Sequence, residues 1–479
     1  MITSRAFWAR LVIQYPDKPY YERSQTMYLK RTVYDKLLEW KSEQNRSTLE
    51  VNGARQVGKT YIINKFADEH FKYKIYINFF EQSGKQFLEC YKQATSWIPG
   101  TKRPEHPLHD AFRLFEPDFA DSDDTVIIID EIQESAEIYN CIREFTRHFQ
   151  AHFIVTGSYL GQILEPEFRY SSGDMTRISI YTLSFCEFLQ AFDGNLYTQY
   201  LSLKSDSPQD SDVYELLKTA YDIYLQIGGY PNVVKTYLET KDIEKARGAL
   251  VNIIDTFTNE STRYFTDILD TRVFTQIFLS VCRILCRESR GLAEGSISEE
   301  LQKLVTRDYS SNLSKAACNR AISWLYFSGI IGFCTKITEM DVLDFKPASR
   351  CYFMDPGLAN YYLSRTGIDS RSISGTLNEN YVYINLKKRQ DFPEEIVFET
   401  PAFATYRGGE IDFIAQSVHS STRYLVEVKS GKGTAATALK ALEQGEAHKL
   451  LYLKGDTKGG IDGKIETLPI YMLERYQFV

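Results

Sequence analysis

The sequence predicts an α/β protein whose first half is built around a parallel sheet with helices on both faces. The chain has 479 residues, enough for about three domains, and its 43% hydrophobic and 25% charged residues are typical of globular proteins. Between residues 48 and 182, short aliphatic runs alternate with helical patterns. Several of these runs are continuous and β-branched, as expected for strands buried on both faces.

The predicted elements follow one another in a regular order. Residues 27–45 carry apolar side chains at helical spacing. Strands are then expected at 48–51, 74–80, 126–129, 153–156 and 177–182. A polar loop is expected over 202–217, and helices from 213 to about 289. Further on, a helix is expected over 378–389, strands over 396–400, 410–416 and 423–431, a helix over 435–449 and a strand over 450–455.

The segment GARQVGKT fits the pattern GxxxxGK[ST] between a predicted strand and a predicted helix. Glycines let backbone N–H groups wrap a β-phosphate, and the following helix directs its positive end at the phosphate. Lys59 would reach the β- and γ-phosphates, and Thr60 would offer its hydroxyl to Mg²⁺. We therefore predict ATP and Mg²⁺ as cofactors, with the nucleotide held by Gly53, Ala54, Arg55, Gln56, Val57, Gly58, Lys59, Thr60 and Tyr61.

A second motif, VIIIDE, ends an aliphatic strand in two carboxylates, Asp130 and Glu131. Asp130 is predicted to hold the Mg²⁺ shell, and Glu131 to orient and deprotonate an attacking water. A protein that only binds ATP could lose the glutamate, so its presence favours hydrolysis.

The next strand ends in Thr156-Gly157-Ser158. These hydroxyls could sense the γ-phosphate, although a turn of small residues remains an alternative. Candidate arginines for the transition state are Arg143, Arg147, Arg169 and Arg177. Arg143 and Arg147 are one helical turn apart beside acidic residues, which favours surface ion pairs for these two.

Two C-terminal strands carry the patterns Glu410-Ile411-Asp412 and Glu427-Val428-Lys429. Residues i and i+2 share a face of a strand. If the strands pair, Asp412 and Glu427 can converge on a divalent metal. Lys429 could then position a metal-bound hydroxide or stabilise charge on a phosphodiester, and Glu379 could complete the cluster. A surface salt bridge is the alternative for the pair formed by Glu427 and Lys429.

The motifs together resemble bacterial and archaeal ATPases of the AAA+ superfamily that carry a C-terminal nuclease-like domain of unknown function. The matching stretches are GARQVGKT, VIIIDEIQ, FIVTGS, TLSFCEFL (182–189), GGYPNVV (228–234) and YFMDPGLANYYL (352–363). The resemblance implies that the region Thr156–Ser158 acts as the first sensor. It also implies that GGYP of a helical lid touches the nucleotide, with Pro231 near the base. Asp174 stands where family members often carry Arg or Lys, so a trans-acting arginine, with Arg169 or Arg177 as candidates, is not assigned.

The C-terminal block resembles the PD-(D/E)XK nuclease fold. The ordered set that carries this resemblance comprises Glu379 on a helix, Asp412 and Glu427-x-Lys429 on strands, and Gln444 on a helix. Residues 295–338 are expected to form a winged helix, whose second helix offers Lys315, Asn319 and Arg320 to DNA. A module that packs against the ATPase and relays its state is the alternative.

These patterns divide the chain into five expected regions. They are an N-terminal helical segment (1–45), a P-loop AAA+ core (46–200), a helical lid (201–288), a winged helix (289–366) and a PD-(D/E)XK nuclease-like domain (367–479).

Charge and hydropathy limit the function. Residues 101–270 hold 29 acidic and 14 basic residues, whereas residues 370–479 hold 14 of each. Nucleic acid cannot therefore be bound over the whole surface. No run approaches the roughly 18 apolar residues of a membrane helix, and the start lacks a signal-peptide pattern, so we expect a cytoplasmic protein without membrane contact.

The predicted function is an ATP-binding and ATP-hydrolysing protein that couples its nucleotide state to a Mg²⁺-dependent nuclease-like domain acting on nucleic acid, DNA foremost. The alternative is a nucleotide-dependent switch that binds a protein partner, with a non-catalytic C-terminal scaffold. The balanced charge of the last 110 residues favours the alternative somewhat, since a DNA groove should be basic. A homo-oligomer is compatible with either function.

Overall fold

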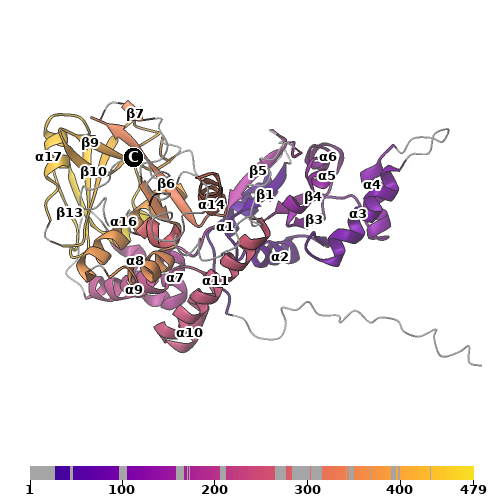
Figure 1. Cartoon of the computed structure of the whole chain (residues 1–479), viewed down its shortest axis with the longest axis horizontal. Coiled ribbons are helices and arrows are strands. Elements are labelled where there is room, and N and C mark those ends of the chain that lie inside the picture. Colours follow the sequence, from indigo (N-terminus) through magenta and orange to yellow (C-terminus); the bar gives the residue numbers. More distant parts are fainter. Residues whose placement is uncertain are drawn as a thin grey trace, which may run out of the picture.

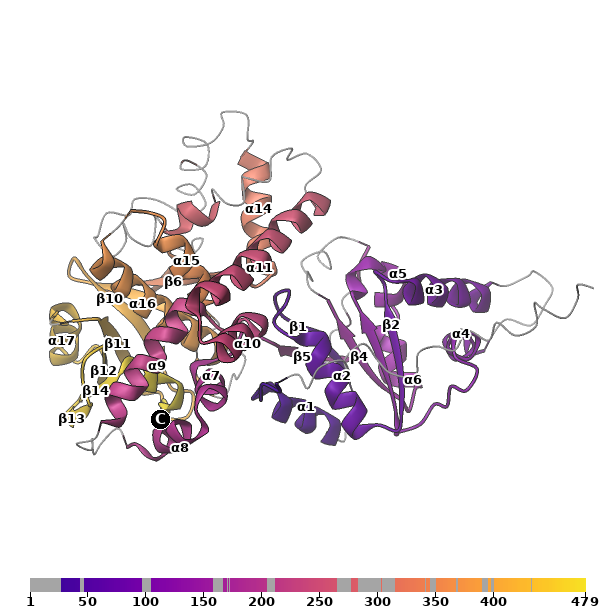
Figure 2. The ribbon, with the colours of Figure 1, turned by 90° about the horizontal axis from the view of Figure 1, so that it is seen from below.

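A computed structural model describes most of the chain (Figure 1). The described residues are 27–43, 47–96, 105–157, 167–169, 171, 173–204, 212–264, 277–282, 303, 315–340, 342–344, 350–367, 369–389, 395–397, 400–431 and 433–479. Figure 2 shows the first sheet and its helices beside a second body. This body holds the C-terminal sheet and the described helices of the region expected as a lid (201–288), for which the name lid is kept only as a label.

The first sheet has five parallel strands in the order β2-β3-β4-β1-β5. They are β1 (Thr48–Asn52), β2 (Tyr73–Asn78), β3 (Thr125–Asp130), β4 (His152–Thr156) and β5 (Met175–Ser179). The helices that accompany this sheet are α1 (Val33–Ser42), α2 (Lys59–His70), α3 (Gln82–Thr95), α4 (Pro107–Phe115), the short η1 (Ile132–Glu134), α5 (Ala136–Tyr139) and α6 (Ile142–His148). The predicted parallel α/β architecture is confirmed.

Strand β3 shows why its sequence is continuously aliphatic. Val126 and Ile128 pack into one hydrophobic cluster, whereas Ile127 and Ile129 pack into another. Successive side chains of a strand point to opposite faces of the sheet. Both faces of β3 are therefore covered, and every residue along the strand is buried.

The lid and its neighbours are helical. Their elements are α7 (Phe185–Phe192), α8 (Gly194–Ser202), α9 (Val213–Ile227), α10 (Pro231–Thr240), α11 (Ile243–Tyr264), α14 (Lys315–Phe327), α15 (Pro356–Leu363), α16 (Ser370–Arg389), α17 (Ala436–Glu443) and the short η3 (Ile470–Arg475). No helix in the described ranges is both long and apolar enough to cross a membrane.

The second sheet has nine strands, eight of them in the order β13-β14-β12-β11-β10-β9-β6-β7, with β8 paired to β6. The strands are β6 (Ile331–Thr338), β7 (Val342–Asp344), β8 (Arg350–Phe353), β9 (Ala402–Tyr406), β10 (Gly409–Gln416), β11 (Arg423–Lys429), β12 (Lys449–Lys454), β13 (Gly460–Asp462) and β14 (Ile465–Pro469).

This sheet crosses the boundary expected at residue 367. Strand β6 pairs in parallel with β9, which brings strands from the expected winged-helix region into the C-terminal sheet. The second expected helix of that region is α14, whereas the first, at 295–305, lies outside the described residues except for residue 303.

The strand expected at 396–400 was misplaced. Its described part forms only an isolated bridge between Ile396 and Ser417, and the strand that pairs with β10 is β9, at 402–406. Residues 396–400 and 402–406 have similarly apolar sequences. Only the pairing of 402–406 with β6 and β10 identifies that segment as the strand.

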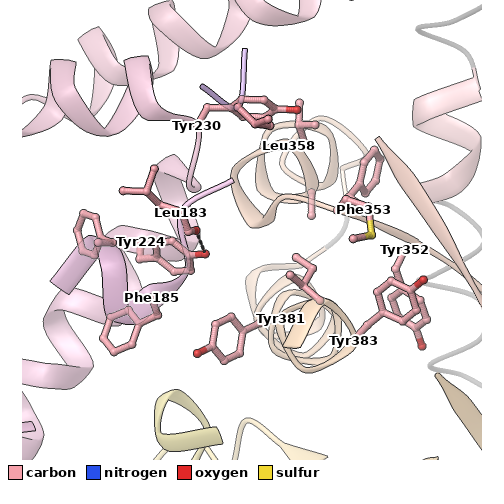
Figure 3. Packing of buried hydrophobic residues seen from close by; sticks show 14 of the residues in the cluster. Leu183, Phe185, Tyr224, Tyr230, Tyr352, Phe353, Leu358, Tyr381 and Tyr383 are labelled. Carbon is pink, nitrogen blue, oxygen red and sulfur yellow. Dashed lines mark hydrogen bonds between the residues drawn. The ribbon is translucent and has the colours of Figure 1, made fainter. Parts of the chain in front are cut away.

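One aromatic-rich core joins the lid to the C-terminal block (Figure 3). Tyr381 of α16 meets Tyr221 of α9 edge to face, with ring centroids 5.0 Å apart. Phe185 of α7 packs against the same Tyr221 at 5.5 Å. Because these rings come from segments up to 196 residues apart, the lid and the last hundred residues share a single hydrophobic interior.

Candidate functional site

The loop between β1 and α2 has a backbone that requires glycine at two places. Gly58 has φ +93° and Gly53 has φ +145°. A Cβ at Gly53 would lie 2.1 Å from the carbonyl oxygen of Ile180, which no side chain could tolerate. Gln56 also adopts a positive φ, of +62°. The loop is therefore fixed in a turned conformation at the start of α2.

Lys59 opens α2 and is folded over this loop. Its Nζ donates to the carbonyl oxygens of Gly53, at 2.7 Å, and Ala54, at 2.9 Å. Only 6% of the residue is exposed. The ammonium is thus held at the loop, within reach of an anion bound there.

Thr60, in the first turn of α2, meets Asp130 at the end of β3. The Thr60 hydroxyl donates to Asp130 Oδ2 at 3.0 Å, and the Tyr76 hydroxyl donates to the same oxygen at 2.7 Å. Burial raises the pKa of Asp130, and these two hydrogen bonds oppose that rise. A buried carboxylate beside a hydroxyl is a donor set that suits Mg²⁺. Sequence reasoning missed Tyr76, which no motif marks.

Glu131 follows Asp130 in a left-handed conformation, with φ +53°. Its Oε2 accepts a hydrogen bond from Gln133 Nε2 at 2.7 Å, and its Oε1 lies 3.8 Å from Arg55 Nη1. Such strained backbone is concentrated at functional sites. The carboxylate is therefore held in one orientation beside the P-loop residue Arg55.

Thr156, the expected sensor, is fully buried at the end of β4. It lies in register with Asp130, and its hydroxyl donates to the carbonyl oxygen of Val51 on β1 at 3.0 Å. The hydroxyl therefore ties the P-loop strand to β4. Ser158 lies outside the described residues.

The lid approaches the P-loop through Pro231. A Cβ at Gly58 would lie 3.6 Å from Pro231 Cγ and 3.9 Å from Arg31 Nη1. Pro231 opens α10 and is separated from the two glycines of GGYP by Tyr230 alone. The residue expected near the base is thus beside the loop expected to hold the phosphates.

Tyr61, the second residue after Lys59 in α2, is half-buried.

The three stretches TLS, GGYP and MDPG form one tight junction. Gly229 N donates to Asp355 Oδ2 at 2.8 Å, and Leu183 N donates to Gly229 O at 2.7 Å. Asp355 is 1% exposed and also caps α15 by accepting from the backbone N–H groups of Gly357 and Leu358. Figure 3 shows Leu183 and Tyr224 at this junction, where the tyrosine hydroxyl donates to the leucine carbonyl.

Close backbone approach explains the glycines of this junction. A Cβ at Gly228 would lie 2.2 Å from Asp355 Oδ1, and one at Gly229 would lie 2.2 Å from Leu183 O. A Cβ at Gly357 would lie 2.4 Å from Ile227 O. The glycines in these separated motifs are therefore required by the same packed contact.

Three of the four candidate arginines pair with carboxylates. Arg147 pairs with Asp174 at 2.7 Å and Arg143 with the same carboxylate at 3.3 Å, as their sequence context favoured. Arg177 pairs with the buried Glu50 of β1 at 2.6 Å. Arg169 is exposed. The acidic Asp174 is thus the hub of an ion-pair cluster on the P-loop sheet.

The C-terminal strands β10 and β11 pair antiparallel, with Phe413 opposite Val426. This register brings Asp412 to Glu427. Asp412 Oδ2 accepts from Val428 N at 2.8 Å and from Lys429 Nζ at 3.2 Å, while the same Nζ donates to Glu427 Oε2 at 2.7 Å. The ammonium therefore bridges the two carboxylates.

Burial and the negative charge of Asp412 raise the pKa of Glu427 to about 8, although Lys429 opposes the rise. Two carboxylates held this close need a cation or a proton between them. The donor set therefore fits a divalent metal that would take the place of the ammonium bridge.

Glu379 of α16 faces the same cluster. Its Oε1 accepts from the Tyr352 hydroxyl at 2.6 Å and lies 3.4 Å from Arg350 Nη1. Burial raises its pKa, Arg350 lowers it, and Asp412 raises it further. Arg350 and Tyr352 of β8 were not expected at this cluster: Tyr352 opens the matching stretch YFMDPGLANYYL, but no role beside Glu379 was predicted for either residue.

Gln444 lies apart from these contacts. Its Oε1 accepts from Arg407 Nη2 at 2.6 Å and from the Tyr406 hydroxyl at 3.4 Å. Within the described ranges, no three His, Cys, Asp or Glu side chains are grouped closely enough to hold a metal ion by themselves. A metal at Asp412 and Glu427 would therefore need further ligands from water or substrate.

The turn between α14 and β6 packs on the P-loop. A Cβ at Gly329 would lie 3.5 Å from Ala54 N and 3.8 Å from Ala54 Cβ. A cavity of about 270 Å³ opens beside this contact, lined by Gly53, Val57, Tyr181, Tyr230 and Tyr326 among others. The expected winged-helix region thus touches the nucleotide loop directly, as the relay alternative requires.

Comparisons with known proteins locate two families in the chain. Residues 45–189 match the family described as AAA domain, and residues 218–370 match a domain of unknown function (DUF8612). No curated protein matches the chain.

Several solved structures are similar at low identity. The Walker-type ATPase PABY2304 of Pyrococcus abyssi is 14% identical, with 70% of this chain and 96% of that chain covered and a TM-score of 0.41. The ORC1 protein of Aeropyrum pernix, solved in complex with DNA, is 13% identical over 72% of this chain and 91% of its own, with a TM-score of 0.28. The RuvB Holliday junction branch migration motor of Thermotoga maritima is 12% identical over 64% and 90%, with a TM-score of 0.27. The family match and the P-loop on a parallel sheet identify residues 45–189 as an AAA ATPase-like domain.

Proposed function

We propose that the protein binds ATP with Mg²⁺ at this P-loop and hydrolyses it. The observation that carries the proposal is the hydrogen bond of 3.0 Å between Thr60 and Asp130, made beside a lysine folded over the loop. The hydroxyl and the carboxylate are the ligand types that Mg²⁺ takes in P-loop enzymes.

Each residue has a distinct role in the proposed reaction. Lys59 leaves the carbonyl oxygens of the loop and pairs with the β- and γ-phosphates. Glu131, oriented by Gln133, accepts a proton from the attacking water. Bound at Thr60 and Asp130, Mg²⁺ would neutralise charge on the phosphate oxygens.

Calorimetry with ATP and ADP tests this proposal on the full chain. Lys59→Ala should abolish nucleotide binding, whereas Lys85→Ala, at an exposed position of α3, should bind normally. Glu131→Gln should keep binding but lower the rate of hydrolysis about 10²-fold or more. A wild-type chain that takes up no nucleotide would overturn the proposal.

We further propose that residues 367–479, together with strands β6 to β8, form a PD-(D/E)XK nuclease-like unit that acts on nucleic acid, DNA first of all. The proposal is supported by the lysine bridge between Asp412 and Glu427 and by the approach of Glu379. Asp412 and Glu427 would hold Mg²⁺, which would activate a water and polarise the scissile phosphate. Lys429 would then stabilise charge on the phosphodiester.

A cleavage assay with Mg²⁺ or Mn²⁺, ATP and a panel of DNA and RNA substrates tests this second proposal. Asp412→Ala and Lys429→Ala should remove cutting and leave ATP hydrolysis unchanged, and Asp462→Ala, at an exposed position of β13, should change neither. If the wild-type chain cuts no substrate, the proposed nuclease activity is overturned.

If no substrate is cut, the alternative function becomes the better account: a nucleotide-dependent switch that binds a protein partner. The two accounts also differ in salt dependence, because only phosphate contacts give an affinity for nucleic acid that falls steeply with salt.

A further inference from the structure

Arg31 precedes α1, and each nitrogen of its guanidinium group donates a hydrogen bond beside the P-loop. Its Nη1 donates to Val57 O at 3.0 Å, its Nη2 donates to Tyr181 O at 2.5 Å, and its Nε donates to Glu187 Oε2 at 3.2 Å. Only 7% of the residue is exposed. A single guanidinium thus ties the nucleotide loop to the segment after β5 and to α7.

Glu187 of α7 is the anion on which this arrangement depends. Its Oε1 accepts from the backbone N–H of Thr32 at 2.7 Å, and its Oε2 accepts from that of Ser184 at 2.9 Å. Burial raises the pKa of Glu187, but Arg31, Lys388 and the backbone N–H groups of Ser184 and Thr32 together hold the pKa below its usual range. The carboxylate is therefore a buried charge that both cations stabilise.

The second cation comes from α16. Lys388 donates to Thr182 O at 3.2 Å and acts electrostatically on both Glu187 and Glu474. Glu474 of η3 in turn accepts from the N–H groups of Phe185 and Cys186 at the start of α7, at 2.7 and 2.8 Å. The N-terminus of α7 is thus held by charges from the C-terminal block.

Helix α16 carries this network to the carboxylate cluster. Lys388 and Glu379 lie on the same helix, separated by about 14 Å along its axis. Glu379 approaches Asp412 and Lys429, and Asn378 Nδ2 donates to Ser430 Oγ at 2.9 Å. A shift of α7 relative to the P-loop would therefore be transmitted to the second site through one rigid element.

We propose that Arg31 is a positioning residue that fixes the P-loop for nucleotide and, through Glu187 and Lys388, couples nucleotide occupancy to α16 and the carboxylate cluster. This inference rests on the proposed nucleotide binding. Arg31 acts on the P-loop and on the coupling, whereas Lys388 acts on the coupling alone.

The test combines ADP affinity with hydrogen exchange of α16 in the full chain. In the wild type, saturating ADP should slow exchange of the P-loop and alter exchange over residues 370–389. Arg31→Gln should weaken ADP binding by about tenfold, the loss of a charge-assisted hydrogen bond, and should abolish the response of α16 at saturating ADP. Arg31→Lys keeps the positive charge but not the planar geometry in which three guanidinium nitrogens donate. It should therefore recover part of the affinity for ADP.

Lys388→Gln separates coupling from binding. It should bind ADP within about twofold of the wild type, because it lacks contact with the P-loop, yet lose the α16 response. Arg371→Gln is the control, because it is the same substitution at an exposed position of α16. It should leave the ADP affinity and the exchange response of α16 unchanged.

The outcomes distinguish this inference from the nucleotide proposal. If the wild type binds no ADP, the proposed function itself fails. If it binds ADP and both Arg31→Gln and Lys388→Gln show the wild-type affinity and α16 response, the positioning role and the coupling are both overturned while nucleotide binding stands. If Arg31→Gln binds more weakly but both variants keep the α16 response, only the coupling is overturned. Should Arg31→Gln fail to fold, Lys388→Gln decides the coupling and Arg31→Lys decides the positioning.

Discussion

At the scale of single residues, each of the two clusters contains a buried carboxylate, Asp130 at 4% exposed and Glu427 at 3%. Asp130 is buried beside two hydroxyls, and Glu427 is buried beside Asp412 and Lys429. A buried carboxylate is costly unless a cation or proton accompanies it. Both sites are therefore built for a partner that carries positive charge.

The pH dependence of stability should reveal the carboxylate pair. The pKa of Glu427 is raised from 4.5 to about 8 in the fold, so the folded state holds a proton that the unfolded state releases. This contribution to stability is fully present below pH 4.5 and is lost as the pH rises through about 8. Urea unfolding should therefore have a lower midpoint near pH 9 than near pH 5.

Glu427→Gln should flatten this decline, since the glutamine does not ionise, and exposed Glu443→Gln should leave it unchanged. An identical decline in the wild type and in Glu427→Gln would contradict the assigned pKa. Added Mg²⁺ should raise the midpoint near pH 9 in the wild type and in Glu443→Gln more than in Glu427→Gln.

At the scale of elements, separated motifs meet where one backbone approaches another. GGYP at the start of α10, the cap of α15 and the segment before α7 form one junction around Asp355. Each of these stretches looks like an isolated turn in the sequence. The requirement for glycine in these stretches is explained only by their contacts with one another in the fold.

Gly229→Ala should destabilise the protein by about 2 kcal/mol or more, because its Cβ would lie 2.2 Å from Leu183 O and the backbone would have to move. Gly248→Ala is the matched control. Gly248 lies in α11, where an added Cβ meets nothing within 4 Å, so this change should stabilise by about 0.5–1 kcal/mol. Denaturant unfolding measures both, and equal effects would contradict the packed junction.

At the scale of the whole molecule, the ATPase-like domain and the C-terminal block are not separate units with separate hydrophobic cores. The first hydrophobic cluster runs from Leu37 in α1 to Phe478 near the end of the chain. Glu474 caps α7, and Arg475 donates to the carbonyl oxygen of Leu203. Distant parts of the sequence therefore depend on each other for their stability.

Tyr381→Ala should lower the stability of both halves together by about 3–5 kcal/mol, because it removes a fully buried ring from the shared core. Hydrogen exchange followed separately at β1 and β11 should give the same loss. Tyr73→Ala, at a ring that is 47% exposed, should change stability by less than about 0.5 kcal/mol. A loss confined to β11 would show that the halves unfold separately.

The sequence by itself determined the elements whose chemistry is local. GARQVGKT must be contiguous because its backbone wraps one phosphate, and VIIIDE must be contiguous because a strand has to deliver its carboxylates to the sheet edge. The order of the five parallel strands and the place of β6 in the second sheet were decided only in three dimensions.

The tertiary structure alone decided which residues support the sites. Arg31, Tyr76, Arg350 and Glu474 each contact groups that lie between 26 and 289 residues away along the sequence. Tyr76 lies 54 residues from Asp130. No local pattern marks such residues, because their roles arise from charges and backbone groups that only folding brings together.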